Sequence, residues 1–359
     1  MSDSPPQPLA SSDPSNRPIH WADPAREVAF HRWLDRLVPE FGLHPHTVSA
    51  ASADASFRRY LRIDSEGGTR IIMDAPPPLE DVRPFVHVAG LLEQAGLLGP
   101  RILSCDADQG FLLTTDLGRE LYLHALRQGP DDRVDALMRA AIAALVQWQQ
   151  RVPAMSLPPY DETALRAELD LFPAWCVERE HGLSWTAAQQ DTWQRVCRTL
   201  IDSALAQPTV AVHRDWMPRN LMVCEGGPGI LDFQDAVRGP ISYDVASMVR
   251  DAFWSWDEAR EIDWTVRYWE AARQAGLPVA EDFGEFWRQV EWMGLQRHLK
   301  ILGIFCRLKH RDGKAHYATD LPRFFTYATR VALRYRELKP LLALLEPMSG
   351  AAVKEGLTF

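Results

Sequence analysis

Several features that would define other classes of protein are missing from this 359-residue chain. Its five cysteines are scattered and none lies in a Cys-x-x-Cys pair, which argues against both a disulfide framework and a zinc site. No apolar run reaches the roughly 18 residues that a membrane-spanning helix needs. The net charge of −9 provides no general attraction to nucleic acid or to anionic lipid. We therefore expect neither a nucleic-acid partner nor a membrane partner.

The start of the chain lacks the apolar segment of a secretory signal. Residues 1–24, rich in Ser, Pro and Asp, are expected to form a disordered tail, and residues 346–359 a C-terminal tail. The hydrophobic content of 46% is ordinary for a globular protein, and the length allows two lobes with well-filled cores. We expect a cytoplasmic monomer.

The pattern of secondary structure changes near residue 117. Before it, helical spacing at 25–38 and 85–95 is mixed with strand-like runs at 56–63, 69–73, 102–104 and 111–114. After it, helical spacing dominates, at 134–148, 186–206, 245–253, 257–275, 283–306 and 321–338. The sequence predicts an α+β fold with a small antiparallel-sheet N-lobe at 25–116 and a large, mainly helical C-lobe at 117–345. A nucleotide is expected in the cleft between such lobes.

The most informative motif begins at His213-Arg214-Asp215 and continues through Asn220 to Asp232. Phosphoryl transfer from ATP needs a carboxylate that orients and deprotonates the attacking hydroxyl. It also needs an amide and a second carboxylate that hold Mg²⁺ against the phosphates. We assign the first role to Asp215 and the metal to Asn220 and Asp232. His213 is expected to brace the loop as a buried residue, because Asp215 already supplies the base.

The spacing of this motif has a structural reason. Asp215 and Asn220 lie at opposite ends of one short loop, so both can face the same phosphate. Asp232 is expected at the end of a hairpin whose strands are 221–223 and 229–231 and whose turn is 225–228. An Asp in a turn is more often a cap or a surface charge, but here the strand, loop, hairpin and second acid occur in order.

Together these motifs resemble the aminoglycoside phosphotransferase and choline-kinase branch of the protein-kinase-like fold. Asp232-Phe233 is followed by Gln234 rather than Gly, and no Ala-Pro-Glu segment follows, so protein kinases proper are less similar. Four further segments, at 54–60, 73–77, 231–240 and 297–305, resemble the bacterial anomeric kinases of N-acetylmuramate and N-acetylglucosamine. The resemblance covers about residues 25 to 340 and implies the bilobal kinase-like fold.

The resemblance also implies roles for individual residues. Asp215 matches the catalytic base, and Asn220 and Asp232 match the magnesium ligands. Residues 114–117 match the hinge that meets the adenine, which places Thr114, Asp116 and Leu117 at the nucleotide. The phosphate-covering loop falls at 51–57 without its usual glycines; there Ser52, Asp54 and Ser56 either direct backbone N–H groups to phosphate or simply form the turn.

One departure from the family concerns the lysine that normally pairs with the phosphates. The strand that carries it in the family ends here as Ile71-Ile72-Met73-Asp74, without a lysine. A cation is still needed to offset the phosphate charge. The candidates are Arg58, Arg59, Arg62 and Arg70, of which we favour Arg59 or Arg62, with Glu93 able to orient one of them. Arginines on a strand are equally typical of a solvated sheet face, and Arg219 is the alternative source of the cation.

The acceptor side is less defined by the sequence. Asp235 could contact a second magnesium, a water or the sugar, or could hold the loop. Arg219 and Trp175 are further candidates for substrate binding. Asp244 has the position of a helix N-cap, although the matching Asp of the family supports the catalytic loop.

We predict an ATP- and Mg²⁺-dependent kinase that phosphorylates a sugar hydroxyl, the anomeric C1 hydroxyl of N-acetylmuramate or N-acetylglucosamine in cell-wall recycling. One alternative is an aminoglycoside or choline-type kinase, for which Glu168, Asp170, Trp175 and Glu178 could form an acidic, aromatic acceptor pocket. The other is a nucleotide-binding regulator without catalysis. The presence of Asp215, Asn220 and Asp232 together argues against it, because a pure binder does not need the base.

Overall fold

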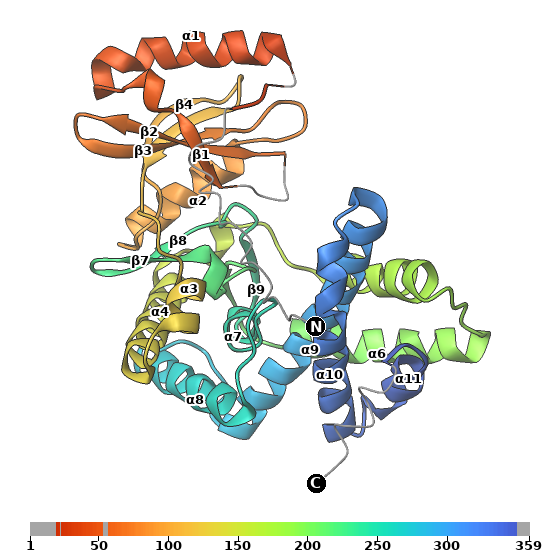
Figure 1. Cartoon of the computed structure of the whole chain (residues 1–359). Helices are drawn as coiled ribbons and strands as arrows, with labels where there is room; N and C mark the ends of the chain where they lie inside the picture. The colour runs from red at the N-terminus through yellow and green to blue at the C-terminus, as the bar shows by residue number, and fades with distance from the viewer. Residues whose placement is uncertain (1–18, 22, 53–56, 350–359) are drawn as a thin grey trace, which may run out of the picture. The chain divides into compact units, whose positions relative to one another are not determined.

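The computed structural model describes residues 19–21, 23–52 and 57–349 (Figure 1). The chain forms two compact units. Unit 1 comprises Met1–Glu93 and Gly99–Gly118, and unit 2 comprises Gln94–Leu98 and Arg119–Phe359. Most of both predicted tails (1–18 and 350–359) lies outside the described residues, as do Asp54 and Ser56.

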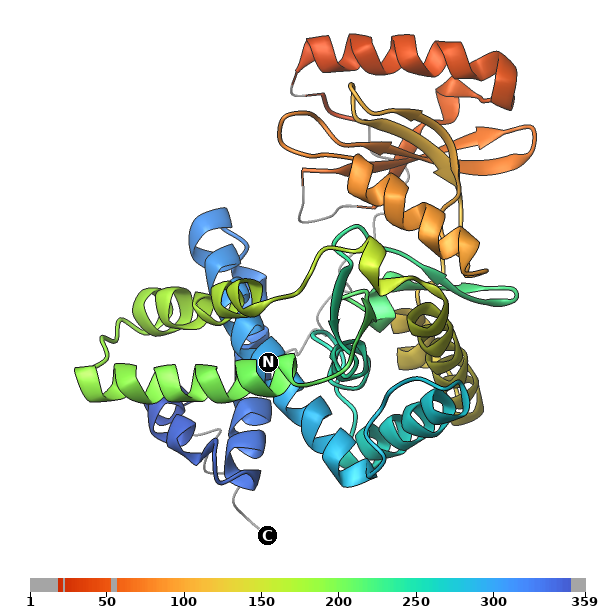
Figure 2. The same cartoon turned by 180° about the vertical axis from the view of Figure 1, so that it is seen from behind.

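Unit 1 is a five-stranded antiparallel sheet between two helices (Figures 1 and 2). The strand order is β1-β2-β3-β5-β4. The helices α1 and α2 cover opposite faces of this sheet. The elements are α1 Pro24–Phe41, β1 Ser49–Ser52, β2 Arg59–Ser65, β3 Gly68–Asp74, α2 Arg83–Gln94, β4 Ile102–Asp106 and β5 Phe111–Thr115, with a 3₁₀ turn at Pro45–Thr47. The four strand-like runs predicted at 56–63, 69–73, 102–104 and 111–114 are confirmed as β2, β3, β4 and β5, with β2 beginning at Arg59.

The core of unit 1 forms between α1 and the sheet. Phe30 and Trp33 of α1 pack with Ile63, Ile72 and Phe111 of the strands, and all are almost fully buried. Ile19 and Trp21, which the sequence placed in the disordered tail at 1–24, also pack against this core, because burial of their apolar side chains is favourable.

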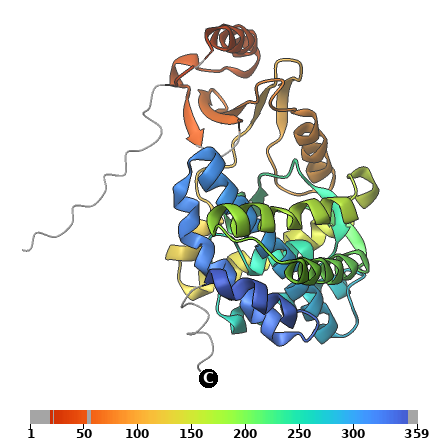
Figure 3. The ribbon, with the colours of Figure 1, turned by 90° about the vertical axis from the view of Figure 1, so that its right-hand side faces the viewer.

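Unit 2 is mainly helical, which confirms the predicted fold class (Figures 1 and 3). Its α-helices are α3 Tyr122–Gln128, α4 Asp131–Arg151, α5 Glu162–Leu169, α6 Ala187–Leu205, α7 Tyr243–Val249, α8 Glu258–Gln274, α9 Phe283–Asp312, α10 Leu321–Arg334 and α11 Leu342–Ser349. A π-helix occupies Phe172–Glu180, and 3₁₀ turns occupy Ala154–Ser156, Pro218–Asn220, Ala315–Asp320 and Lys339–Leu341. None of the helices in the described part combines the length and apolarity that a membrane span requires.

Two small hairpin-like sheets lie among these helices. Strands β7 (Leu221–Cys224) and β8 (Gly227–Ile230) pair antiparallel, as predicted. Strands β6 (Thr209–Val212) and β9 (Val237–Pro240) also pair, although they are 24 residues apart, and this pairing was not expected. The β6–β9 sheet joins the two ends of the segment 213–236, which carries the predicted site residues, and the β7–β8 hairpin lies within that segment.

Helix α9 is the longest element of unit 2, and several of its polar side chains are buried in the interior of that unit. It packs against the π-helix, α6, α7 and α10, and it lies beside α10 in Figures 2 and 3. Glu291, Gln296, Arg297 and His298 are all buried on it.

Two helix boundaries differ from the sequence prediction. The helix expected at 245–253 ends at Val249, because the next residue, Arg250, turns into the interior between Glu261 and Glu291. Residues 346–349, expected in the C-terminal tail, form the last turn of α11, where Met348 is buried.

Candidate active site

The structure brings the three predicted catalytic residues together in unit 2. The loop after β6 carries Asp215 and Asn220, and Asp232 follows β8. The Asn220 amide nitrogen donates to the backbone oxygen of Asp215 at 3.0 Å and lies 3.4 Å from Asp232 Oδ2. The backbone N–H of Leu231 donates to the backbone oxygen of Asn220 at 2.9 Å, which fixes the hairpin end against the loop.

The donor set fits a magnesium ion. Because the Asn220 side-chain nitrogen faces Asp215 and Asp232, its carbonyl oxygen Oδ1 is the atom that would face a metal. Magnesium prefers oxygen ligands and is commonly held by one or two protein side chains plus substrate phosphates. In the described part of the chain no group of three or more His, Cys, Asp and Glu side chains could hold a metal. A metal at Asn220 and Asp232 would therefore rely on nucleotide phosphates for its remaining ligands.

Backbone strain coincides with this site. Among the described residues, Arg214 and Asp232 are the only non-glycine residues with positive φ, at 77° and 58°. Such conformations cost free energy and persist where the surroundings enforce them, often at functional sites. Gln234 contributes to this enforcement, since its side-chain nitrogen donates to Asp232 Oδ1 at 2.8 Å. The sequence showed Gln234 only as a departure from protein kinases.

His213 braces the loop, as predicted. It is 1% exposed, and its Nε2 lies 3.0 Å from the backbone oxygen of Leu231. Its Nδ1 accepts the backbone N–H of Asp215 at 3.3 Å, so Nε2 carries the proton. Burial lowers the pKa of His213 to about 4, which keeps the ring neutral.

Asp244 is not the N-cap suggested by its sequence position. It lies within the first turn of α7, whose N-cap is Ser242. Its carboxylate instead accepts the backbone N–H groups of His213 at 2.7 Å and Arg214 at 2.9 Å. This is the loop-supporting role that the family resemblance implied. Burial raises the pKa of Asp244 to about 7.

A buried arginine that the sequence analysis left without a role contacts the predicted base. Arg297 of α9 donates to Asp215 Oδ1 at 3.2 Å, to the backbone oxygen of Arg214 at 2.6 Å and to the Tyr243 hydroxyl at 3.3 Å. Its side chain is 3% exposed, whereas that of Asp215 is 36% exposed. Burial alone would raise the pKa of Asp215, but the charges of Arg297 and Lys300 hold it below its usual range.

Glu168 of α5 is also tied to this region. It accepts from Arg214, from Lys300 at 2.7 Å, from Gln296 at 3.0 Å and from Tyr160. Despite burial, the charges of Lys300 and Arg214 lower the pKa of Glu168 to about 2. Glu168 was expected to attract a cationic acceptor, but two cations of the chain already offset its charge. Asp170, from the same expected pocket, pairs with Arg166 at 2.8 Å.

The other predicted acceptor residues occupy varied environments. The Arg219 guanidinium lies 4.5 Å from the centroid of the Phe253 ring. Asp235 is exposed and accepts from the Gln234 side chain at 3.2 Å. Trp175 is half-buried on the π-helix. Their roles in acceptor binding stay predictions.

In unit 1 the candidate phosphate-binding arginines are paired with protein groups. Arg59 pairs with Asp74, which Arg26 also contacts, and Arg62 pairs with Asp116 at 2.6 Å. The remaining two bond Glu80 at 2.9 Å (Arg58) and the backbone oxygens of Gly67 and Thr69 (Arg70). Glu93 pairs with Arg101 at 3.2 Å, not with one of these four, because it faces the segment before β4.

The predicted hinge residues end β5. Thr114 is buried and its hydroxyl lies 3.4 Å from the Ile71 oxygen, while Leu117 is half-buried. Burial would raise the pKa of Asp116, but hydrogen bonds from Arg62, Thr69 and the Gly118 backbone hold it below its usual range. Ser52 ends β1. Nucleotide contacts by all of these residues stay predictions.

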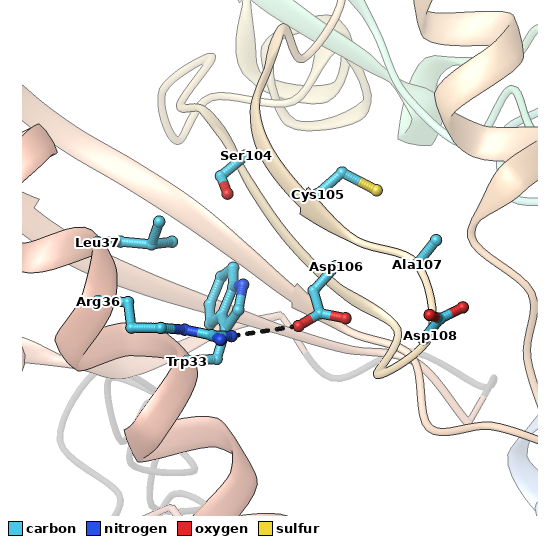
Figure 4. Close-up of a pocket in the computed structure, with 8 residues that line it drawn as sticks. All are labelled: Trp33, Arg36, Leu37, Ser104, Cys105, Asp106, Ala107 and Asp108. Carbon is cyan, nitrogen blue, oxygen red and sulfur yellow. Dashed lines mark hydrogen bonds and ion pairs between the residues drawn. The ribbon is translucent and has the colours of Figure 1, made fainter.

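A cavity of about 370 Å³ in unit 1 lies apart from every predicted site residue (Figure 4). Its lining comes from α1 and from the end of β4, and includes Trp33 and Cys105. Arg36 and Asp106 form an ion pair of 3.3 Å across it. An open surface hollow bordered by a solvent-exposed ion pair offers no catalytic chemistry, and we assign it no role.

The fold is that of known small-molecule kinases. Choline kinase LicA from Streptococcus pneumoniae superposes with a TM-score of 0.59 at 11% identity, covering 84% of this chain and 99% of its own. Aminoglycoside 2'-phosphotransferase-IIIa gives 0.58 at 14% identity, covering 86% and 99%. At these identities the likeness concerns the fold, and it confirms the predicted kinase-like class.

The model of the phosphotransferase enzyme family matches residues 47–283, so the chain belongs to this family. The N-acetylmuramate/N-acetylglucosamine kinase of Pseudomonas aeruginosa is 47% identical over 338 residues, which cover 92% of this chain and 99% of that protein. The kinase of the same name from Neisseria meningitidis is 45% identical over 337 residues, covering 93% and 99%. These similarities confirm the predicted resemblance and the prediction of a phosphotransferase.

Proposed function

We propose that this protein transfers the γ-phosphoryl group of ATP, with Mg²⁺, to the anomeric C1 hydroxyl of N-acetylmuramate or N-acetylglucosamine, within cell-wall recycling. The observation that carries the kinase activity is the grouping of Asp215, Asn220 and Asp232 in one loop and hairpin. The acceptor is inferred from relatives of that name that align with almost the whole chain.

In the proposed mechanism the protein mainly positions the reacting groups. Arg297 holds Asp215 Oδ1, and we assign the second oxygen, Oδ2, to the acceptor hydroxyl. Asn220 Oδ1 and Asp232 would hold the magnesium ion, which neutralises phosphate charge when bound. An anomeric hydroxyl is more acidic than an ordinary alcohol, so a carboxylate of low pKa suffices to orient it and to accept its proton.

The charges around Asp215 disfavour the alternative of a cationic acceptor. Arg297 forms an ion pair with Asp215, and Arg214 and Lys300 both form ion pairs with Glu168. An aminoglycoside or choline would bring further positive charge close to these three cations, whose contacting carboxylates are already paired. The alternative of a non-catalytic regulator is disfavoured by the supported base, which nucleotide binding alone does not require.

The test is ATP consumption against a panel of acceptors. N-Acetylmuramate and N-acetylglucosamine should stimulate Mg²⁺-dependent ADP release, whereas choline and aminoglycosides should leave it at the background rate. Stimulation by a cationic acceptor alone would contradict the proposed substrate class. Absence of any acceptor-dependent turnover, with ATP still bound, would support the regulator.

A further inference from the structure

Two cations beside the catalytic loop share one carboxylate. Lys300 of α9 and Arg214 of the loop both donate to Glu168 Oε1. Lys300 is the first of the five lysines of the chain, which all lie at position 300 or beyond. It lies one turn of α9 after Arg297, so the two cations project toward the same loop.

Three cations of the chain gather at this point although the whole chain carries −9. Arg214, Arg297 and Lys300 bring three positive charges, and the carboxylates that they contact directly, Glu168 and Asp215, bring two negative ones. Uncompensated charge in a partly buried site is costly unless a ligand or water offsets it.

The cations also have donors to spare. The ammonium group of Lys300 has three hydrogens, and its hydrogen bonds in the described structure go to Glu168 and, at 3.4 Å, to the Tyr243 hydroxyl. Arg214 Nε is buried without a hydrogen-bond partner among the described residues. Both side chains reach solvent, at 13% exposure for Lys300 and 24% for Arg214.

These cations and the predicted metal ligands are joined to the base through different elements. Arg297 joins Asp215 to Tyr243, and Tyr243 joins Lys300, so α9 connects the base to the cation pair. Asn220 and Asp232 instead approach Asp215 through its backbone oxygen and through the hairpin. An acceptor whose hydroxyl meets Asp215 would therefore extend toward Lys300 and Arg214.

We propose that Lys300 and Arg214 form a carboxylate-binding subsite that recognises an acidic substituent of the acceptor sugar. This inference rests on the proposed function. It gives a structural reason why the protein would prefer one of the two proposed acceptors over the other. N-Acetylmuramate carries a carboxylate that N-acetylglucosamine lacks. The carboxylate would accept the third Lys300 hydrogen in a charge-assisted hydrogen bond, while the neutral sugar would leave that hydrogen to water.

The first experiment uses the wild-type protein and changes only the acceptor. The kcat/KM for N-acetylmuramate is compared with that for its neutral, nearly isosteric carboxamide. We expect the acid to be preferred about tenfold or more, mainly through KM, as for a hydrogen bond to a charged group. Equal values for acid and amide would overturn the inference without affecting the proposed kinase activity.

The second experiment changes the protein. Lys300→Met should reduce the acid-to-amide preference to within about twofold, because a neutral side chain of similar length replaces the cation. Lys300→Arg should retain most of the preference. Lys309→Met is the matched control, since Lys309 also lies on α9 and pairs with a carboxylate, that of Glu180, at 2.6 Å. Its acid-to-amide preference should equal that of the wild type.

The outcomes distinguish failure of the carboxylate-binding subsite from failure of the proposed kinase function. Equal losses for acid and amide in Lys300→Met would assign Lys300 to loop support or to the phosphoryl group, and would overturn the carboxylate subsite. If Lys300→Met does not fold, the wild-type comparison of acid and amide decides. If the wild type phosphorylates neither sugar, the proposed function fails, and the inference fails with it.

Discussion

Asp215 is fixed at three of its atoms. His213 Nδ1 accepts its backbone N–H, Asn220 donates to its backbone oxygen and Arg297 donates to Oδ1. Positioning of this kind can supply a large part of a rate enhancement, because the acceptor meets a carboxylate already oriented. The catalytic role of Asp215 is therefore testable separately from its contribution to the fold.

We expect Asp215→Asn to lose roughly three orders of magnitude or more in kcat while retaining ATP binding and the fold. The amide keeps the shape and can still receive Arg297 at its oxygen, but it cannot accept the hydroxyl proton. Steady-state kinetics, ATP titration and thermal unfolding measure the three quantities. A variant within tenfold of the wild-type kcat would remove Asp215 from the proposed mechanism.

His213 provides a prediction about pH. The unfolded chain protonates this side chain near the ordinary pKa of 6.5, but the folded chain does so only near 4. The unfolded state therefore binds more protons within this window, and folding stability falls as the pH drops from 6.5 to 4. The contribution of His213 to this loss is about 3 kcal/mol by order of magnitude.

His213→Gln should show a weaker fall in stability over the same window. Glutamine can donate to Leu231 and accept from Asp215, but it does not titrate. The measurement is the free energy of unfolding by urea at several pH values, taken as the difference between wild type and variant. This difference removes the opposite contribution of Asp244, whose raised pKa favours the folded state on acidification. Parallel curves for the two proteins would contradict the buried, neutral histidine.

At the scale of elements, a buried ionic cluster joins the helices that carry the site. Arg250, just after α7, pairs with Glu261 of α8 at 3.0 Å and Glu291 of α9 at 2.8 Å. All three side chains are 0% exposed. Arg330 and Arg334 of α10 contact the same two glutamates from a more exposed side. The cluster fixes α7, and with it Asp244, against α9.

Arg250→Met should destabilise the fold by about 3 kcal/mol or more, because two buried carboxylates lose a shared partner. Arg267→Met on α8 is the matched control. Arg267 pairs with Asp263 near the surface, where such pairs contribute roughly 0.5 kcal/mol or less. Urea unfolding measures both variants. Similar small losses would show that Arg330 and Arg334 suffice for the glutamates.

The features that the sequence predicted depend on residues close together in the chain, whereas those that it missed depend on residues far apart in the chain. The β7–β8 hairpin, the catalytic loop and the sheet hairpins of unit 1 follow from local patterns of strand and turn residues, and the sequence predicted them. The β6–β9 pairing and the contacts of Arg297 with Asp215 join residues far apart in sequence. The partner of a charged residue within a helical run is not evident from the sequence, so the sequence could not assign Arg297 or Lys300 to the site, nor show that Glu168 pairs with cations of the chain.

In unit 1, too, the sequence shows composition but not the partners of charged side chains. The absence of a lysine was evident, because the first lysine of the chain is Lys300. Which arginine has a protein partner was not, since the pairings of Arg59 with Asp74 and Arg62 with Asp116 depend on strand register and on the hinge. Whether either arginine exchanges its carboxylate for a phosphate is the part of the nucleotide site that stays a prediction.

At the scale of the whole molecule, the proposed activity combines a kinase-like fold, a carboxylate held in position as the base, and an amino sugar as the acceptor. Phosphoryl transfer to C1 differs from transfer to any other hydroxyl of the sugar, because only the C1 product loses its reducing end. Transfer to the more acidic C1 hydroxyl, as proposed, would require only a base of low pKa. The site of phosphorylation is therefore the central claim.

The most direct test uses N-acetylglucosamine labelled with ¹³C at C1, incubated with the wild-type protein, ATP and Mg²⁺. The account predicts a product whose phosphorus signal is split by the labelled carbon and whose reducing end is lost, with neither change in Asp215→Asn. A phosphorylated sugar that keeps its reducing end and lacks this coupling would contradict the account.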